Sequence, residues 1–426
     1  MQYQHYHKTC LMDKPLHKHI SHHARRFHSH ITKYLYERDT IFATIWVFLF
    51  IVILGSIPLN LGSLNPIKLS LKDFDFNDLA YSKLGQGENT DLDNNIKIID
   101  IGQANREELA MMLDKGASYN PKVMALDVLF YAEKDPHQDS LIKETFKRNK
   151  NLIAATQLIP SGKEGDTISK AGNYINTASK YAYVNLFTDS FSSIRYHEPF
   201  LKDYKGTEYK SFSASIIEAY NQEAYEKFEK KAHHKIMINY SRHEKKYLII
   251  PWEDLMMDNV DSAALKGKIL LFGYISHNKD DISDKFFTPM NHRWYGKSIP
   301  DMPGIVVHAN IISMALDGNY VKKLPLWANL LIAVLVCWLH MSFFIRYYLE
   351  SHIWFHLVAK IAQVASAIFF VWLGIYFFGK YRIKVDLKMS LIVIALAVDV
   401  IYFYEAWAVW MHKKFGFKTV FKPHHH

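Results

Sequence analysis

Cysteine is scarce in this chain of 426 residues, which has only Cys10 and Cys337. The stretch from 60 to 325 contains none, and this excludes a disulfide framework and a cysteine-based zinc site there. An extracytoplasmic location remains compatible with this composition, because oxidising surroundings permit disulfides without requiring them.

The centre of the chain lacks the excess of positive charge that both ends carry. Residues 1–39 carry a net charge of +4 and residues 326–426 carry +6, whereas residues 40–325 carry −1. A nucleic-acid-binding domain would place a basic face on the folded region, so we expect no nucleic-acid partner. The distribution is typical of cytoplasmic segments that flank membrane helices.

Long hydrophobic runs, in contrast, are plentiful, and four of them have about the 20 residues that a helix needs to cross a bilayer. They cover 40–59, 326–345, 353–378 and 387–411. The first follows a basic lead of 39 residues and has no clear A-x-A cleavage site, so we interpret it as an uncleaved anchor rather than a signal peptide.

Four spans predict that both tails, 1–39 and 412–426, lie in the cytoplasm and that the domain from 60 to 325 lies outside. The basic tails agree with the positive-inside tendency, although the outer loop "GKYRIKVDLK" is also basic. The first tail is rich in histidine. We interpret it as a basic segment near anionic lipid, with transition-metal binding as the alternative. The final three histidines resemble a purification tag.

The stretch from 60 to 325 alternates short apolar runs with helical patterns and shows no internal repeat. Apolar runs predict strands at 96–101, 123–130, 152–156, 235–240 and 268–273. Helical spacing predicts helices at 106–113, 139–149, 211–232 and 304–316. Continuous apolar strands bounded by helices are typical of a mostly parallel sheet covered by helices on both faces. The predicted fold is therefore an α/β domain plus about four transmembrane helices.

Four segments of this stretch occur in a recognisable order: "IKIIDIGQANREEL", "PKVMALDVLF", "LKGKILLFGYISHNKDDISDKFFTPM" and "MPGIVVHANIISMALDGNYV". Together they resemble the CHASE2 family, an extracytoplasmic sensory domain of bacterial receptors, over roughly residues 60–411. The resemblance implies an N-terminal anchor, a sensor domain outside and about three further membrane helices in the bacterial inner membrane.

The chain departs from the family pattern at two places. Gly102 stands where family members often have a second acidic residue after the first strand. After the last span only "HKKFGFKTVFKPHHH" follows, where family members commonly continue into an output domain. We therefore expect any signal to leave through a partner protein.

Six polar residues of the domain are candidates for a ligand site or a structural polar site: Asp100, Asp127, Asp281, Thr288, His308 and Asn310. Ligands of open α/β sheets bind beyond the carboxyl ends of the strands, where Asp100 and Asp127 are predicted. A structural interpretation is favoured for each. Asp127 then caps a turn, Asp281 belongs to a solvated acidic loop, and His308 and Asn310 bond loop backbone and hold the last helix of the domain.

Catalytic and metal motifs are absent from these candidates. No G-x-S-x-G elbow supplies a nucleophile for His308. Asp127 lacks the Asp-x-Asp pattern, and the acidic loop "HNKDDISD" lacks the glycine and glutamate of an EF-hand loop. We therefore expect no catalytic residue, no metal site and no cofactor.

Four polar residues lie within the predicted spans: Lys360, Gln363, Asp399 and Glu405. Ionisable groups inside a membrane are expensive and usually face a partner, so these residues are candidates for intramembrane coupling. Similar depths predict that Lys360 pairs with Glu405. Asp399 is predicted to bond Gln363, a second subunit or another protein.

These observations favour a non-enzymatic inner-membrane sensor or scaffold that acts through a membrane protein partner, with homo-oligomerisation left open. Two alternatives are an envelope enzyme that uses Asp127 and His308, and a subunit of a transport or secretion complex that uses Asp399. Convergence of Asp127 and His308 in an open pocket with a nucleophile would favour the enzyme.

Overall fold

The computed structural model describes residues 34–56, 78–82, 92–160, 168–170, 174–189, 192–203, 206–232, 235–276, 278, 280–291, 299–350 and 352–421. The chain divides into two compact units. One, the α/β unit, takes residues 61–323 and 374–384, and the other, the membrane-helix unit, takes 1–60, 324–373 and 385–426. Most of the histidine-rich tail and the final three histidines lie outside the described residues.

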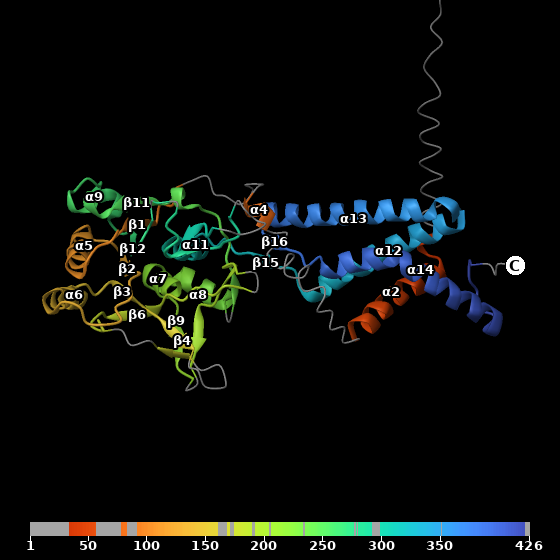
Figure 1. The fold of residues 1–426 in the computed structure, drawn as a ribbon, viewed down its shortest axis with the longest axis horizontal. Helices are drawn as coiled ribbons and strands as arrows, with labels where there is room; N and C mark the ends of the chain where they lie inside the picture. Colours follow the sequence, from red (N-terminus) through yellow and green to blue (C-terminus); the bar gives the residue numbers. More distant parts are fainter. Residues whose placement is uncertain are drawn as a thin grey trace, which may run out of the picture. The chain divides into compact units, whose positions relative to one another are not determined.

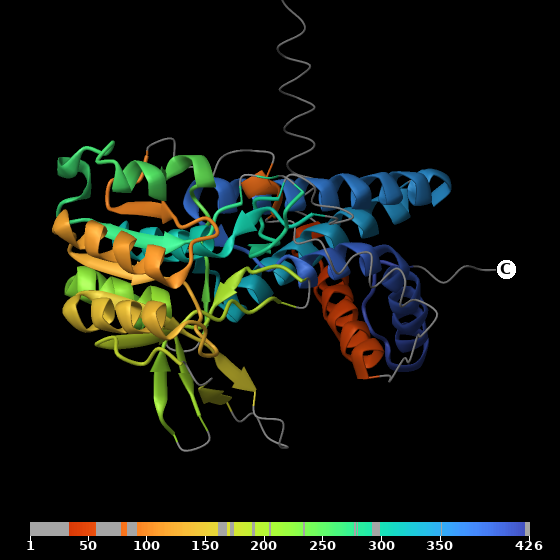
Figure 2. The same cartoon turned by 60° about the vertical axis from the view of Figure 1, so that its left-hand side comes forward.

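Six parallel strands form the central sheet of the α/β unit, in the order β11-β1-β12-β2-β3-β6. Their bounds are β1 Ile96–Asp100, β2 Val123–Leu126, β3 Leu152–Thr156, β6 Lys180–Tyr183, β11 Leu248–Pro251 and β12 Ile269–Gly273. Every residue of β1, β2, β3 and β12 is buried, as both faces of the sheet are covered. The predicted α/β fold with a parallel sheet is confirmed. Figure 2 shows β12, in teal, beside the orange arrow of β1.

Helices cover both faces of this sheet. α5 (Arg106–Ser118), α6 (Pro136–Arg148) and α9 (Trp252–Met256) lie on one face, and α7 (Phe212–Tyr220) and α11 (Gly304–Leu316) lie on the other (Figure 1). A capping box of Asn105 and Glu108 starts α5. α11 approaches β12 so closely that a Cβ on Gly273 would lie 2.8 Å from Ile305.

The structure changes several predicted elements. β2 ends at Leu126, so Asp127 to Phe130 leave the sheet. The helix predicted over 211–232 is two helices, because Asn221 ends α7 and caps α8 (Gln222–Lys231). The predicted strand 235–240 is wrong for the main sheet: only β10 (Ile236–Met237) forms, antiparallel to β7. β6 and β11 were not predicted, because they are short and only partly buried.

Short elements complete the α/β unit. The helices are α4 Asp78–Ser82, the 3-10 turn Glu244–Lys246 and α10 Ser262–Leu265. The paired strands are β4 Leu158–Pro160 with β5 Ile168–Lys170, β7 Tyr196–His197 with β10, β8 Phe200–Lys202 with β9 Glu208–Lys210, β13 Lys285–Phe286 with β14 Met302–Pro303, and β15 Lys322–Lys323 with β16 Ile383–Lys384.

Among the residues that the structure describes, four helices are long and apolar enough to cross a membrane: α2 Arg38–Ser56, α12 Leu326–Glu350, α13 His352–Tyr381 and α14 Lys388–Phe415. Within the membrane-helix unit, α2, α12 and α14 pack against one another (Figure 1). Asp39 at the start of α2 is fully buried and accepts hydrogen bonds from Tyr404 Oη (2.5 Å), Thr419 Oγ1 (3.0 Å) and the Val420 N–H (2.8 Å). The start of α2 and the segment after α14 therefore meet at one end of this unit.

Candidate functional site

A cavity of about 420 Å³ opens at the carboxyl edge of the parallel sheet. Its wall is built by residues that follow five different strands and by the start of α11. The lining residues are Ile101, Asp127, Val128, Leu129, Gln157, Val184, Asn185, Leu186, Tyr274, Asp284, Phe286, Gly304 and His308. Ligands of parallel α/β sheets bind at this edge, and the volume lies in the range of small-molecule sites.

Asp127 is one of the two acidic residues that line the cavity. It follows β2 directly, its backbone N–H donates to the Phe272 carbonyl over 2.8 Å, and the residue is partly exposed. No hydrogen bond reaches its carboxyl from any residue that the structure describes. Burial, and then the charge of Asp284, raise the pKa of Asp127 to about 8. At neutral pH this carboxyl therefore tends to hold a proton, and a positively charged group would favour its ionised form.

Asp284 is the second acidic residue that lines the cavity. Its residue is largely exposed, yet its carboxyl lies against the first turn of α11, where a Cβ on Gly304 would be 3.1 Å from both oxygens. Burial of the carboxyl raises the pKa of Asp284 to about 6, and the Gly304 N–H opposes this shift. Gly304, the glycine of the Pro-Gly turn, is therefore needed to let this carboxyl approach the helix.

His308 reaches the cavity wall from α11 but is 1% exposed. Its Nδ1 lies 2.9 Å from Ser213 Oγ, and its ring also contacts the Val184 backbone. Burial lowers the pKa of His308 to about 4, and the Val184 contact opposes this. The imidazole is thus neutral at physiological pH, with partners already in place.

Ser213 is the nucleophile-type neighbour that sequence reasoning did not find. It is fully buried and does not line the cavity. The same pairing occurs nearby, where His197 Nε2 lies 2.8 Å from Ser211 Oγ, again with both residues buried. Two such pairs at the start of α7 indicate a structural role in packing that helix.

The other four predicted polar residues lie away from the cavity wall. Asp100 Oδ1 accepts from the N–H groups of Gly102 (3.0 Å) and Ile275 (3.1 Å). Thr288 donates to Asp301 over 2.5 Å. Asp281 accepts from Tyr274 Oη (2.5 Å), and this tyrosine lines the cavity.

Asn310 makes the contacts to loop backbone that its structural interpretation requires. Its Oδ1 accepts from the N–H groups of Ser241 and Arg242, each over 3.2 Å, and its Nδ2 donates to the carbonyls of Arg242 and Val306, each over 3.0 Å. All hydrogen-bonding positions of the amide are occupied, so Asn310 ties α11 to the loop before the 3-10 turn.

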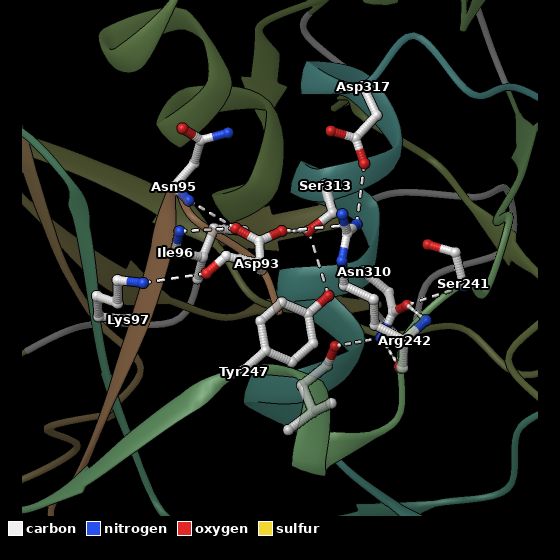
Figure 3. Close-up of polar contacts among 11 residues, drawn as sticks. Asp93, Asn95, Ile96, Lys97, Ser241, Arg242, Tyr247, Asn310, Ser313 and Asp317 are labelled. Atoms are coloured by element: carbon white, nitrogen blue, oxygen red, sulfur yellow. Dashed lines mark hydrogen bonds and ion pairs between the residues drawn. The ribbon is translucent and has the colours of Figure 1, made fainter. Parts of the chain in front are cut away.

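A buried polar network, drawn in Figure 3, extends this attachment along α11. Asp93, just before β1, accepts from Ser313 Oγ over 2.7 Å and lies 3.5 Å from Arg242 Nη1. Arg242 Nη1 also pairs with Asp317 over 2.9 Å, and Tyr247 Oη lies 3.2 Å from Ser313 Oγ. The far half of α11 is therefore fastened to the start of the sheet, while its first turn faces the cavity.

In the membrane-helix unit the predicted pairing of Lys360 with Glu405 is wrong. Lys360 Nζ lies 3.9 Å from Asp399 Oδ1, and Glu405 accepts from Tyr348 Oη over 2.5 Å. Glu405 lies six residues beyond Asp399, about 9 Å along α14, which separates it from the level of Lys360. Gln363 bonds the carbonyls of Ile394 (2.6 Å) and Ala395 (3.0 Å) instead of Asp399.

Asp284, Tyr274 and Asn185 line the cavity but were not among the predicted site residues. Asp284 belongs to the acidic loop "HNKDDISD". The composition of this loop does not reveal that Asp284 adopts a positive φ (55°) or that it approaches α11. Asn185 follows β6, a strand that the sequence did not predict.

The fold and the cavity define an α/β domain with a cavity at the carboxyl edge of its sheet, joined in one chain to membrane-length helices. The family model described as the CHASE2 domain matches residues 85–343, more than half of the chain, and the chain belongs to this family. CHASE2 is an extracytoplasmic sensor domain. No curated protein and no solved structure matches the chain.

Proposed function

We propose that this chain is a non-enzymatic membrane sensor that binds a small molecule in the sheet-edge cavity and acts through a partner protein by its membrane helices. One observation carries the proposal. The first turn of α11 lines the cavity, and the same helix is followed, after residues 317–325, by α12. A ligand that contacts Gly304 or Asp284 would therefore bear on the element that leads into the membrane.

The cavity chemistry favours a ligand with both a positive charge and an apolar body. Two carboxyl groups, Asp127 and Asp284, face the cavity, and each has a pKa raised by burial. An ammonium group would stabilise the ionised form of both carboxyls. Leu129, Val184 and Phe286 supply apolar wall for the rest of the molecule.

The non-enzymatic part of the proposal is supported by the state of His308. Its ring already contacts Ser213 and Val184, and Ser213 has no exposure to the cavity. A general base needs a substrate proton within hydrogen-bond reach, and a nucleophile needs access to the substrate. Neither condition is met by this pair as it lies.

An inner-membrane location with both tails in the cytoplasm is part of the proposal. The described part of the chain has four apolar helices of membrane length, an even number, and the buried Asp39 joins the start of α2 to Val420 after α14. Both features support a common side for the two ends.

The test is a thermal-shift screen of the full-length protein in lipid nanodiscs with matched panels of primary amines and carboxylic acids. We expect amines to raise Tm, Asp127→Asn to abolish the shift, and Asp280→Asn to retain it. Asp280 is a suitable control because it is an exposed acid of the same loop that does not line the cavity. If only the carboxylic acids raised Tm, the argument that the two carboxyl groups favour a positively charged ligand would be refuted.

The same samples also test the alternative that the protein is an enzyme. The sensor predicts that Ser213→Ala leaves the ligand shift in place and that the bound compound is recovered unchanged. Turnover of the compound that disappears in Ser213→Ala would replace the sensor with a hydrolase.

A further inference from the structure

A ladder of polar contacts joins α13 to α14 within the membrane-helix unit. Gln363 bonds the Ala395 carbonyl, Lys360 lies 3.9 Å from Asp399, and His356 Nε2 lies 2.9 Å from Tyr402 Oη. Positions 356, 360 and 363 share one face of a helix, as do 395, 399 and 402. α13 is the least buried of the four membrane-length helices, so this ladder is an important part of its attachment.

The middle step of the ladder is open to the outside of the unit. The side chain of Lys360 is 56% exposed and that of Asp399 is 63% exposed, although Ala359 and Val398 beside them are buried. Asp399 lies eleven residues from the start of α14 and sixteen from its end, about 17 Å and 24 Å, so its short side chain does not reach either headgroup layer. A charged pair exposed to hydrocarbon is expensive, and such groups usually face protein.

We propose that a second copy of this chain covers the pair, so that Lys360 of each copy also contacts the partner's Asp399. The face carries one acid and one base, which makes it complementary to itself. The two groups lie 3.9 Å apart and therefore at nearly the same depth. A twofold axis along the membrane normal preserves depth, so it brings each lysine level with the other copy's aspartate.

A different membrane protein would have to supply its own opposite charges at this depth, whereas a second copy supplies both without any further assumption. The surrounding exposed residues, including Ile361, Val364 and Phe403, give the apolar contact that packing between membrane helices requires. This inference adds a second copy of this chain to the assembly, beside the partner protein of the proposed function. It rests on the pair of Lys360 and Asp399 and is independent of the cavity.

The test measures the mass of the full-length protein in nanodiscs by native mass spectrometry, where one chain is 49.7 kDa. We expect a dimer for the wild type and self-association at least about tenfold weaker for K360D and for D399K, which place like charges together. The double variant K360D/D399K restores opposite charges and should dimerise. K380D, which changes an exposed lysine at the end of α13, is the matched control and should also dimerise.

Co-expression of differently tagged K360D and D399K chains shows whether the single variants are folded. Two such chains are complementary to each other, so we expect a mixed dimer even where each alone is monomeric. A monomeric wild type, single variants that dimerise like the wild type, or no mixed dimer would each overturn the proposal. So would a different protein found on this face in place of the second copy. In all these cases the ligand-induced shift of the cavity would be unaffected, so the proposed function would be judged separately.

Discussion

Asp127 has different properties in the folded protein from those its position in the sequence indicates. In the sequence it is one acid at the end of an apolar run. In the structure the residue lines the cavity, its carboxyl receives no hydrogen bond from a described residue, and it lies near a second acid. Desolvation disfavours the charged form of such a group, and the charge of Asp284 adds to this effect.

At this scale we predict that Asp127→Asn stabilises the protein at high pH. The pKa of Asp127 rises from 3.8 to about 8 on folding, so its contribution to stability is full below pH 3.8 and is lost as the pH rises through 8. Asparagine keeps a neutral side chain at every pH. We expect a gain that grows above pH 4 and reaches several kcal/mol, up to about 5, near pH 8.5, because each unit of pKa shift corresponds to about 1.4 kcal/mol; it is measured as Tm of the full chain. If the difference in Tm between the variant and the wild type did not change with pH, the pKa of Asp127 would be close to its ordinary value.

His308 gives an opposite dependence in the acid range. Burial lowers its pKa to about 4, so its neutral state contributes stability that is present above pH 6.5 and is lost as the pH falls through 4. We expect His308→Gln, which has no charge to gain, to reduce the loss of Tm between pH 6.5 and 4 relative to the wild type. An unchanged acid slope would mean that the ring titrates normally.

At the scale of elements, the two ends of α11 have different surroundings. The network of Asp93, Arg242 and Asp317 fastens its far half, whereas Gly304 and His308 line the cavity. Under the proposed function, a change at the cavity would have to pass through this network, because the fastened end of α11 precedes α12 in the chain.

Asp93→Ala should therefore be strongly destabilising. It removes a carboxylate that is 3% exposed from beside Arg242, which is also buried, and removing one partner of a buried pair costs about 3–5 kcal/mol. Asp317→Ala is the comparison, because Asp317 is 36% exposed and an exposed partner contributes about 1 kcal/mol or less. Urea unfolding measures both, and equal losses would contradict the buried network.

At the scale of the whole molecule, the chain combines a sensor-family domain with the four membrane-length helices found in its described segments. We expect alkaline phosphatase fused after Lys323 to be active, and green fluorescent protein fused at the C-terminus to be fluorescent. This pattern follows if residues 60–325 lie outside and both tails lie in the cytoplasm. The basic loop after α13 opposes this orientation, so the two fusions test it strictly. The reverse pattern would mean that residues 60–325 lie in the cytoplasm and both tails lie outside.

The sequence by itself determined the parallel sheet and the membrane helices. Strands buried on both faces need continuous apolar runs, so β1, β3 and β12 were predicted almost to the residue. A span needs an uninterrupted apolar length, which identified α2, α12, α13 and α14. The quoted motifs were sufficient to find the family.

Only the tertiary structure decided which polar groups meet. Asp127 and Asp284 are far apart in the sequence, as are Ser213 and His308, and no local pattern relates them. They come together because parallel strands bring their carboxyl ends to one edge, and because α11 packs across β12 against Gly273. The choice of Asp399 rather than Glu405 for Lys360 was likewise set by how α13 lies along α14. Apolar periodicity is a local property of the chain, whereas a polar contact depends on the arrangement of whole elements.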